Sequence, residues 1–237
     1  DLSRFENVKS VTDAVYNPLS SALVISARER GINATGGLYM LVSQAAYAVE
    51  KFTGVSISAD KTEEVYREIL RDKKNIVLIG MPGCGKTTIG KISADRLHKE
   101  FIDTDAEIIK RINMPISEYF AKQGEESFRR LESEVIKEIS ACRSSVIATG
   151  GGAVLNPANI RLLKENGTVI FIDRPLEKLV TTADRPLSSN RELLEKRYKE
   201  RYGLYCAAAD IKIDAVNEIE QNVKNIEEVF LNENSCN

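Results

Sequence analysis

From residue 75 onward, short apolar runs alternate with longer segments of mixed polarity. The runs are rich in β-branched residues and have the length of strands, whereas the segments between them have the length and pattern of helices. This alternation predicts an α/β fold in which helices cover both faces of a parallel sheet. The predicted strands are residues 75–80, 101–103, 145–149, 168–173 and 210–215, and the predicted helices begin at Lys86, Asp105, Pro157, Pro175 and Glu192, with one more after residue 215.

The start of the chain has a different, mainly helical pattern. One strand is expected at Val11–Tyr16, followed by helices at Pro18–Arg30 and Leu38–Phe52, each of which stops at a glycine. A polar junction then opens a helix that is expected to end at Leu70. We therefore divide the chain into a small helical segment, residues 1–70, and a larger α/β domain, residues 71–237.

The composition is that of an ordinary globular protein. The chain has 237 residues and a formal net charge of −2, so it lacks the electrostatic footprint of a nucleic-acid-binding protein. Its longest apolar runs have strand length, which predicts no membrane span. The first residues, "DLSRFENVKS", have no signal-peptide features and no initiator methionine. We expect a cytoplasmic protein whose chain begins inside a longer open reading frame.

Cysteine and histidine chemistry is not indicated. The four cysteines lack the spacing of a zinc or redox site, so we interpret them as free thiols in a reducing compartment. The single histidine, His98, follows a predicted helix and is interpreted as a surface residue. This pattern argues against histidine acid–base catalysis and against a histidine metal site.

The segment "GMPGCGKT", Gly80 to Thr87, fits the phosphate-loop pattern G-x-x-x-x-G-K-[ST] between a predicted strand and helix. Its glycines would let successive backbone N–H groups point at one anion, and the following helix adds its positive end. Lys86 would reach the β- and γ-phosphates, and the Thr87 hydroxyl would bind Mg²⁺. We therefore predict binding of ATP and Mg²⁺, with nucleotide contacts from Gly83, Cys84, Gly85, Lys86, Thr87 and Thr88.

Later segments bear on the phosphoryl acceptor. "FIDTDAEI" places Asp103 and Asp105 two residues apart at a predicted strand end, so that their side chains point in different directions. "GEESFRRLE" places Arg129 and Glu132 three residues apart on one helical face. "ATGGGAV" puts glycines at the carboxyl end of a strand, where open α/β sheets bind ligands.

Two arginines follow, Arg185 in the proline-stiffened segment "ADRPLSS", which suits a lid, and Arg201 in "RYGLYCAAAD". Together with the phosphate loop, these motifs resemble those of shikimate kinases, in the same order, from about Asn75 to the end of "DIKIDA". The resemblance implies a P-loop fold like that of nucleoside monophosphate kinases. It also implies ATP-dependent phosphorylation of the shikimate 3-hydroxyl, giving shikimate 3-phosphate and ADP.

The resemblance also implies roles for single residues. Arg129 and Arg201 would pair with the shikimate carboxylate, because planar guanidinium groups suit bidentate recognition. Asp105 would hold the acceptor hydroxyl and accept its proton, while Asp103 would hold Mg²⁺. Arg185 would fold over the phosphates as the lid closes, so that the catalytic residues would be Asp105, Lys86 and Arg185. Gly151 and Gly152 would contact the ring of the substrate through backbone N–H groups.

Some of these residues have other interpretations. Asp103 could be a helix cap and Asp105 a solvated turn residue. Glu132 could serve only to orient Arg129. Arg197, one turn before Arg201, competes with it for the carboxylate role, and Tyr198, Tyr202 and Tyr205 are interpreted as packing residues.

The function also has alternatives. The chain could be another small-molecule P-loop kinase, such as a gluconate kinase, or a nucleotide-dependent binding module. It departs from the shikimate kinase pattern where threonines precede "RPL" in place of an arginine, and where Gly203 replaces a proline.

The segment before the kinase motifs is similar to the C-terminal end of shikimate dehydrogenases. The similarity rests on "DAVYNP", Asp13 to Pro18, and on "GLYMLVSQA", Gly37 to Ala45. It implies that Tyr16 and Gln44 would touch shikimate and that Gly37 would lie near a nicotinamide. Because no dinucleotide-binding fingerprint occurs in the chain, we expect no dehydrogenase activity from it. We interpret it as the end of a dehydrogenase fused upstream of the kinase; a truncated bifunctional enzyme and a chance helical appendage are the alternatives.

Overall fold

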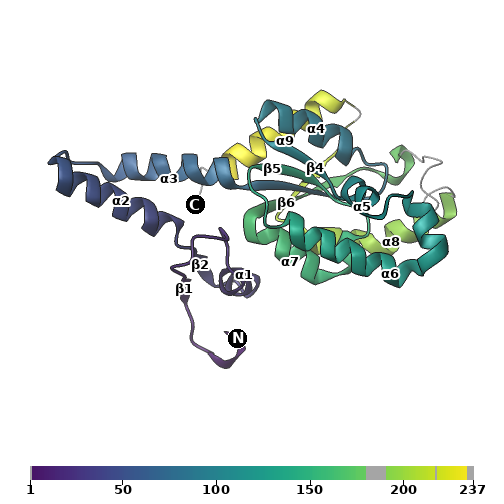
Figure 1. The fold of residues 1–237 in the computed structure, drawn as a ribbon, viewed down its shortest axis with the longest axis horizontal. Coiled ribbons are helices and arrows are strands. Elements are labelled where there is room, and N and C mark those ends of the chain that lie inside the picture. The colour runs from purple at the N-terminus through teal and green to yellow at the C-terminus, as the bar shows by residue number, and fades with distance from the viewer. Residues whose placement is uncertain (1, 180–190, 217, 234–237) are drawn as a thin grey trace.

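The computed structural model describes residues 2–179, 191–216 and 218–233. From residue 75 onward it contains a five-stranded parallel sheet with the strand order β4-β5-β3-β6-β7, which confirms the predicted α/β class. Helices α4 and α9 cover one face, and α7 and α8 pack on the other with α6 beside them (Figure 1). The strands are β3 (Asn75–Ile79), β4 (Glu100–Asp103), β5 (Ser145–Ala148), β6 (Gly167–Asp173) and β7 (Ile211–Asp214), and the helices are α4 (Lys86–Arg96), α5 (Thr104–Ile112), α6 (Ile116–Ile139), α7 (Pro157–Asn166), α8 (Arg191–Ala208) and α9 (Ile219–Glu233).

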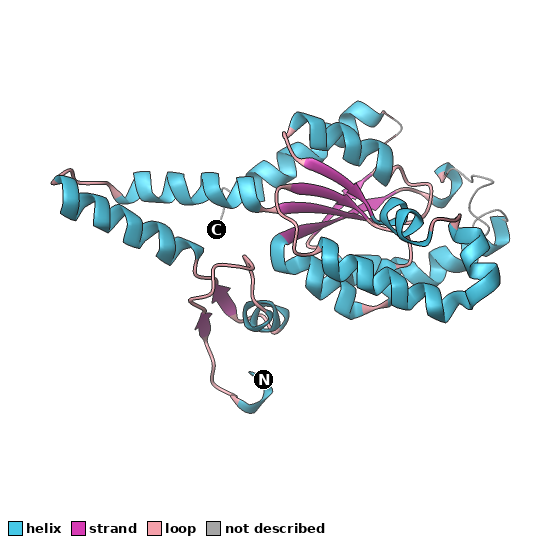
Figure 2. Ribbon diagram, viewed as in Figure 1, coloured by secondary structure: helices cyan, strands magenta, loops and turns pink. Residues whose placement is uncertain are grey.

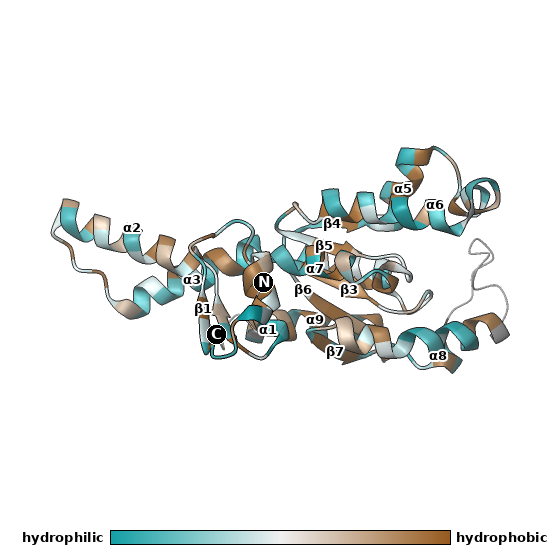
Figure 3. Cartoon of the chain, turned by 90° about the horizontal axis from the view of Figure 1, so that it is seen from below, coloured by the Kyte–Doolittle hydropathy of each residue, from teal (hydrophilic) through white to brown (hydrophobic). Residues whose placement is uncertain are grey.

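The central strands form the core. Every residue of β3 and β6 is buried, as expected for strands of a parallel sheet that is covered on both faces. Figure 2 shows the strands between layers of helices, and Figure 3 shows that the interior strands are coloured as apolar. Because all five strands are parallel, their carboxyl ends meet at one edge of the sheet. That edge carries the phosphate loop (Gly80–Thr87) after β3 and, after β5, the three glycines Gly150–Gly152, which we call the glycine segment.

The observed elements differ from the prediction at several bounds. The helical segments expected from Asp105 onward are α5, which already begins at Thr104, and α6, and they are separated where Asn113 adopts a left-handed conformation at the end of α5. Helix α6 itself contains a kink at Gly124, where φ is 78° and ψ is 170°. The segment after Pro175 forms only a 3-10 turn, Leu176–Lys178, in the described part of the chain. His98 is exposed, as predicted.

The N-terminal residues form a small block with its own apolar cluster. Strands β1 (Ser10–Thr12) and β2 (Asn33–Thr35) pair in parallel, and α1 (Ala22–Glu29) packs against them. The prediction missed β2, and it extended the first strand and the first helix too far. The helix begins after Ser21, whose hydroxyl accepts a hydrogen bond from the Val24 N–H in the first turn. The buried cluster consists of Leu2, Val24, Ala27 and Ala34.

This block is attached to the larger α/β part of the chain through α7. The Ser20 N–H donates to the Glu165 carbonyl at 2.8 Å, and the Leu19 N–H donates to Asn166 Oδ1 at 3.1 Å. On the surface, Arg161 of α7 forms two hydrogen bonds with the carboxylate of Glu29. Residues at the end of α1 and residues before it therefore contact the same helix.

Two antiparallel helices, α2 (Leu38–Thr53) and α3 (Ala59–Lys73), form an arm that projects from the body (Figure 1). Helix α3 runs directly into β3 and extends past Leu70, its predicted end. Lys99 supports the extra turn, because its ammonium group is held at the negative end of the helix. Burial lowers the pKa of Lys99 to about 8. Its Nζ donates to the carbonyls of Arg71, Asp72 and Lys74 at 3.0, 3.2 and 3.0 Å.

Two smaller findings concern the remaining sequence expectations. Within the described residues, no helix combines the length and the apolar character that crossing a membrane requires. The thiols of Cys84, Cys142 and Cys206 are free, with Cys84 buried and Cys206 exposed. Cys236 lies outside the described residues.

Candidate active site

The phosphate loop joins β3 to α4 and has the backbone that its glycines predict. Gly80, Gly83 and Gly85 have φ values of 147°, 81° and 105°, a region that favours glycine. Lys86, at the start of α4, is buried, and its Nζ donates to the carbonyls of Gly80 at 2.8 Å and Met81 at 3.0 Å. The lysine ammonium group therefore lies against the loop itself. Cys84 is buried within the loop, whereas Thr88 is exposed on α4.

Asp103 connects the end of β4 to the phosphate loop. The Thr87 hydroxyl donates to Asp103 Oδ2 at 2.8 Å. The other carboxylate oxygen accepts hydrogen bonds from the N–H groups of Asp105 and Ala106, so Asp103 also caps α5. The cap interpretation and the metal interpretation of Asp103 are thus compatible, because each uses a different carboxylate oxygen.

These oxygen atoms fit Mg²⁺ chemistry. A hydroxyl and a carboxylate lie within hydrogen-bond distance of each other beside a phosphate loop, and Mg²⁺ prefers few protein oxygens together with phosphate oxygens and water. Among the described residues, no cluster of three or more histidine, cysteine, aspartate or glutamate side chains could hold a metal by itself. Thr87 and Asp103 would therefore share the ion with the nucleotide.

Asp105 lies in the first turn of α5, against the glycine segment that follows β5. A Cβ atom built on Gly150 would lie 2.6 Å from Asp105 Oδ1 and 3.0 Å from Glu132 Oε1, so a side chain at this position would collide with both carboxylates. The Gly150 N–H donates to the Thr104 hydroxyl at 2.8 Å, which fixes the segment. The prediction that Asp105 follows a strand end is correct in chain order, although the residue itself is helical.

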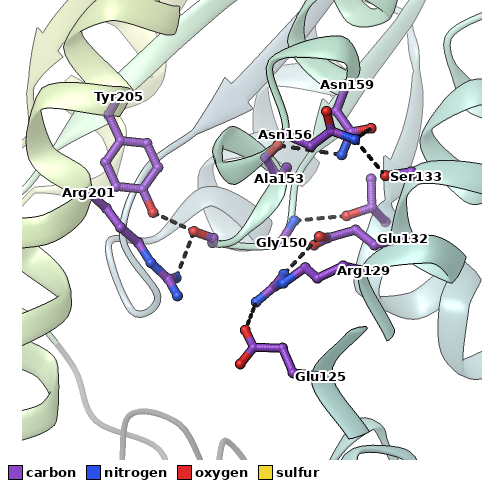
Figure 4. Close-up of polar contacts among 12 residues, drawn as sticks. Glu125, Arg129, Glu132, Ser133, Gly150, Ala153, Asn156, Asn159, Arg201 and Tyr205 are labelled. Carbon is purple, nitrogen blue, oxygen red and sulfur yellow. Dashed lines mark hydrogen bonds and ion pairs between the residues drawn. The ribbon is translucent and has the colours of Figure 1, made fainter. Parts of the chain in front are cut away.

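Arg129 of α6 and Arg201 of α8 approach the same glycines from different helices (Figure 4). Arg201 Nη1 donates to the Gly151 carbonyl at 3.0 Å. A Cβ atom on Gly152 would lie only 2.0 Å from Arg129 Nη1. The fold therefore brings together two guanidinium groups that are 72 residues apart in sequence (201 − 129).

Glu132 holds Arg129 in place. Arg129 Nη1 donates to Glu132 Oε2 at 2.7 Å, and Nη2 donates to Glu125 at 3.2 Å (Figure 4). Burial raises the pKa of Glu132 and outweighs the opposing effect of the Arg129 charge. Burial lowers the pKa of Arg129, but its two carboxylate partners outweigh that effect and raise it overall. The orienting role suggested for Glu132 is consistent with this geometry.

Arg197 lies near this pair of arginines. Its pKa is lowered first by burial and then by the positive charge of Arg201, with a smaller contribution from Arg129. Arg201 is itself more than nine-tenths buried and contacts the glycine segment, which favours it over Arg197 as the residue aimed at a ligand.

Tyr205 is buried and stacks on Phe171, as its interpretation as a packing residue predicts, but its hydrogen bond to the site and the position of Pro82 were not predicted. The Tyr205 hydroxyl donates to the same Gly151 carbonyl as Arg201, at 2.6 Å. Its spacing of four residues from Arg201 on one helical face was the available signal. The Pro82 ring of the phosphate loop packs on Gly151, where an added Cβ would lie 2.8 Å from the proline Cδ. Arg185, the predicted lid residue, lies outside the described residues.

Comparison with known proteins decides the family. The family model for shikimate kinase matches residues 82–230, which is more than half of the chain. The chain belongs to the shikimate kinase family. A shikimate kinase from Clostridium botulinum (strain Eklund 17B / Type B) is 47% identical over 164 residues, which cover 68% of this chain and 99% of the relative. One from Caldicellulosiruptor bescii is 48% identical over 125 residues, which cover 51% of this chain and 73% of the relative.

Solved shikimate kinases have the same fold. The structure of the enzyme from Acinetobacter baumannii in complex with shikimate matches with a TM-score of 0.66 and 31% identity, over 70% of this chain and 98% of that one. The enzyme from Aquifex aeolicus matches with a TM-score of 0.60 and 36% identity, over 68% and 98%. As a member of the shikimate kinase family, the chain is a phosphotransferase.

Proposed function

We propose that the chain transfers the γ-phosphoryl group of ATP to the 3-hydroxyl of shikimate. Family membership supports this activity, and one structural observation indicates which residues perform it. Asp105, Arg129 and Arg201 converge on the glycine segment after β5, beside the phosphate loop after β3. This arrangement suits a small alcohol that carries a carboxylate.

The acceptor side of the reaction follows from these contacts. Arg129 and Arg201 would bind the carboxylate of shikimate, which fixes the ring by paired charged hydrogen bonds. Asp105 would accept the proton of the 3-hydroxyl while the oxygen of that hydroxyl forms a bond to the γ-phosphorus. The bond between the γ-phosphorus and the β-phosphate oxygen breaks, and ADP leaves with those electrons. Positioning and electrostatic stabilisation therefore account for most of the rate.

The donor side uses the phosphate loop. Lys86 would exchange the carbonyls of Gly80 and Met81 for phosphate oxygens, and the loop N–H groups would hold the phosphate chain. Mg²⁺, bound through Thr87 and Asp103, would offset the negative charge that develops on the phosphates. Arg185 retains its proposed role over the phosphates.

A coupled assay of ADP release tests the activity. We expect turnover with shikimate and none with gluconate, because gluconate lacks the rigid ring that matches the glycine segment. Asp105→Asn should lower kcat by at least about 100-fold, the usual size of a general-base contribution. Asp60→Asn, on the exposed surface of α3, serves as the matched control. Shikimate-independent ADP release alone, or full activity of Asp105→Asn, would contradict the proposal.

We also infer that residues 1–70 consist of a C-terminal part of a shikimate dehydrogenase, about residues 1–54, followed by a linker helix. In this proposal they are fused to a kinase domain of residues 71–237 in a cytoplasmic enzyme. Support comes from how the two dehydrogenase-like motifs meet. The Gly37 N–H donates to the Val15 carbonyl at 2.8 Å, and a Cβ atom on Gly37 would lie 2.1 Å from the Ala14 carbonyl oxygen. The second motif therefore requires a glycine where it packs on the first.

The exposed surface of residues 1–70 gives further support. Large apolar side chains gather on α2 and before it, and large exposed apolar surfaces usually mark an interface. The exposed fractions are 52% for Tyr16, 54% for Met40, 60% for Tyr47 and 88% for Phe52. A dehydrogenase domain upstream would cover such a surface.

The coding sequence upstream of Asp1 tests the fusion. We expect it to encode a dinucleotide-binding loop of the form G-x-G-x-x-G and a lysine–aspartate pair. The chain of 237 residues should show no binding of NADPH in a fluorescence titration, because it has no such loop. An unrelated upstream sequence would overturn the fusion, and NADPH binding would favour a bifunctional chain in its place.

A further inference from the structure

Arg174 occupies the edge of the sheet that carries the phosphate loop. It directly follows β6, the strand that pairs with β3. The two strand ends approach closely, since a Cβ atom on Gly80 would lie 2.7 Å from the Ile172 carbonyl oxygen. The guanidinium group of Arg174 reaches the other end of the loop, where its Nη1 lies 3.9 Å from the position of a Cβ atom on Gly85. The end of β6 therefore lies beside the Gly80 end of the loop, and Arg174 lies beside its Gly85 end.

Among the described residues, no carboxylate pairs with the guanidinium group of Arg174. Its Nε is buried and has no hydrogen-bond partner among the described residues, and no ion pair to Arg174 occurs among them. The neighbouring carboxylate of Asp173 is engaged elsewhere, with Lys212 at 2.9 Å and the Tyr202 hydroxyl at 3.0 Å. Arg174 is thus a cation whose adjacent acidic residue serves other partners.

The position beside α4 makes this arrangement costly without an anion. The N-terminal end of a helix carries partial positive charge, and a guanidinium group beside it is repelled rather than attracted. The other two arginines of the site differ from Arg174 because their terminal nitrogens are engaged. Arg129, whose Nε also lacks a partner among the described residues, donates through Nη1 to Glu132, and Arg201 donates to the Gly151 carbonyl. A buried donor without a partner next to a cradle of N–H groups calls for a shared anionic ligand.

We propose that Arg174 binds the phosphate chain of the nucleotide at the Gly85 end of the loop, whereas the Lys86 ammonium group lies at the Gly80–Met81 end. This inference rests on the proposed function only in taking the phosphoryl donor to be a nucleoside triphosphate. Arg174 is then a donor-binding residue, separate from the arginines that face the acceptor. The nucleotide is then held by Lys86 of α4 and by Arg174, which follows β6, and the phosphate charge neutralises that of Arg174.

Isothermal titration of the purified chain with ADP, AMP and adenosine in the presence of Mg²⁺ tests this role, with shikimate titrated separately. Arg174→Ala should weaken ADP binding by about 10- to 100-fold, the effect of losing a charge-assisted hydrogen bond. Adenosine and shikimate should bind as in the wild type, and Arg174→Lys should recover part of the ADP affinity. Arg161→Ala is the matched control, because Arg161 is an exposed arginine on α7 that pairs with Glu29.

Two results would overturn the inference: unchanged ADP affinity in Arg174→Ala, or equal losses for ADP and adenosine. The second result would place the role of Arg174 in the nucleoside or in the fold, and thermal unfolding of the variant distinguishes those two. The proposed function is judged separately by shikimate-dependent turnover of the wild type. A wild-type chain that binds ADP through Arg174 but does not phosphorylate shikimate would leave this inference standing and remove the proposed acceptor.

Discussion

The substitution Gly152→Ala, which adds a single methyl group, should weaken shikimate binding strongly while changing the stability of the fold much less. The backbone of Gly152 has a φ of −103° and a ψ of −6°, which alanine adopts without strain. A Cβ atom there would lie 2.0, 2.5 and 2.7 Å from Nη1, Cζ and Nη2 of Arg129. These distances are far below van der Waals contact, so in Gly152→Ala the guanidinium group must move. The movement takes it away from the site proposed for the shikimate carboxylate.

The size of the effect follows from what Arg129 loses. One hydrogen bond between charged groups contributes about 1.5–3 kcal/mol, so the affinity for shikimate should fall about 10- to 100-fold. The fold should change much less. Alanine in place of glycine restricts the unfolded chain and stabilises by about 0.4–1 kcal/mol. Weakening the bond to the buried Glu132 costs about 1–3 kcal/mol, so the net loss of unfolding free energy should lie between about 0 and 2.6 kcal/mol.

Steady-state kinetics and urea unfolding measure the two effects. The KM for shikimate should rise by the predicted factor, while the KM for ATP should stay within about twofold of the wild type, since the loop is untouched. Gly203→Ala is the control, because a Cβ atom at that exposed position of α8 meets nothing within 4 Å. It should stabilise the chain by up to about 1 kcal/mol without altering either KM. A normal KM for shikimate in Gly152→Ala would refute the assignment of Arg129 to the carboxylate.

Three further predictions concern the supports of the site. Tyr205→Phe removes the 2.6 Å bond to Gly151, so we expect a loss of about 0.5–1.5 kcal/mol in urea unfolding and a smaller rise in the KM for shikimate than for Gly152→Ala; no change in either would exclude a positioning role. Lys99→Met removes the three hydrogen bonds that Lys99 donates to carbonyls at the end of α3, so hydrogen exchange of the last amides of that helix should accelerate at least about tenfold. Unaltered protection would contradict the proposal that Lys99 caps the helix. Because the pKa of Glu132 is raised in the folded state, the folded protein keeps this proton at pH values where the unfolded chain has lost it. The unfolding free energy, relative to that of Glu132→Gln, should therefore fall as the pH rises from 4.5 through the raised value. A difference that is constant with pH would show that Glu132 does not titrate in this range.

The sheet could be predicted because its signal is local. The buried runs of β3 and β6 are continuous in sequence and are bounded by turn residues, so each strand reveals itself without knowledge of its neighbours. The bounds at Leu70 and Pro18 were wrong for the opposite reason. The end of α3 depends on Lys99, more than 25 residues away, and the start of α1 depends on which of several polar residues caps it. Periodicity carries no information about either.

For the site, the motifs identified the residue types but not their supports. That Arg129 presses on Gly152 and that Arg201 holds the Gly151 carbonyl are consequences of helix packing across the sheet edge. Arg174 could not be singled out at all, because it belongs to no motif and becomes notable only once β6 lies beside the loop. A residue that reaches the site only because of the strand order cannot be recognised from a single sequence.

The order of the strands also bears on how the chain is made. β3 comes first among the five strands but lies in the middle of the sheet, between β5 and β6. Asn75 is hydrogen-bonded to Ser145, 70 residues further on, so at a synthesis rate of about 5–20 residues per second the apolar strand waits roughly 4–14 s for its first partner. Helix α3 precedes it and has local contacts with α2 that need no later residues. The arm can thus fold first and hold one end of a strand whose partners have yet to be synthesised.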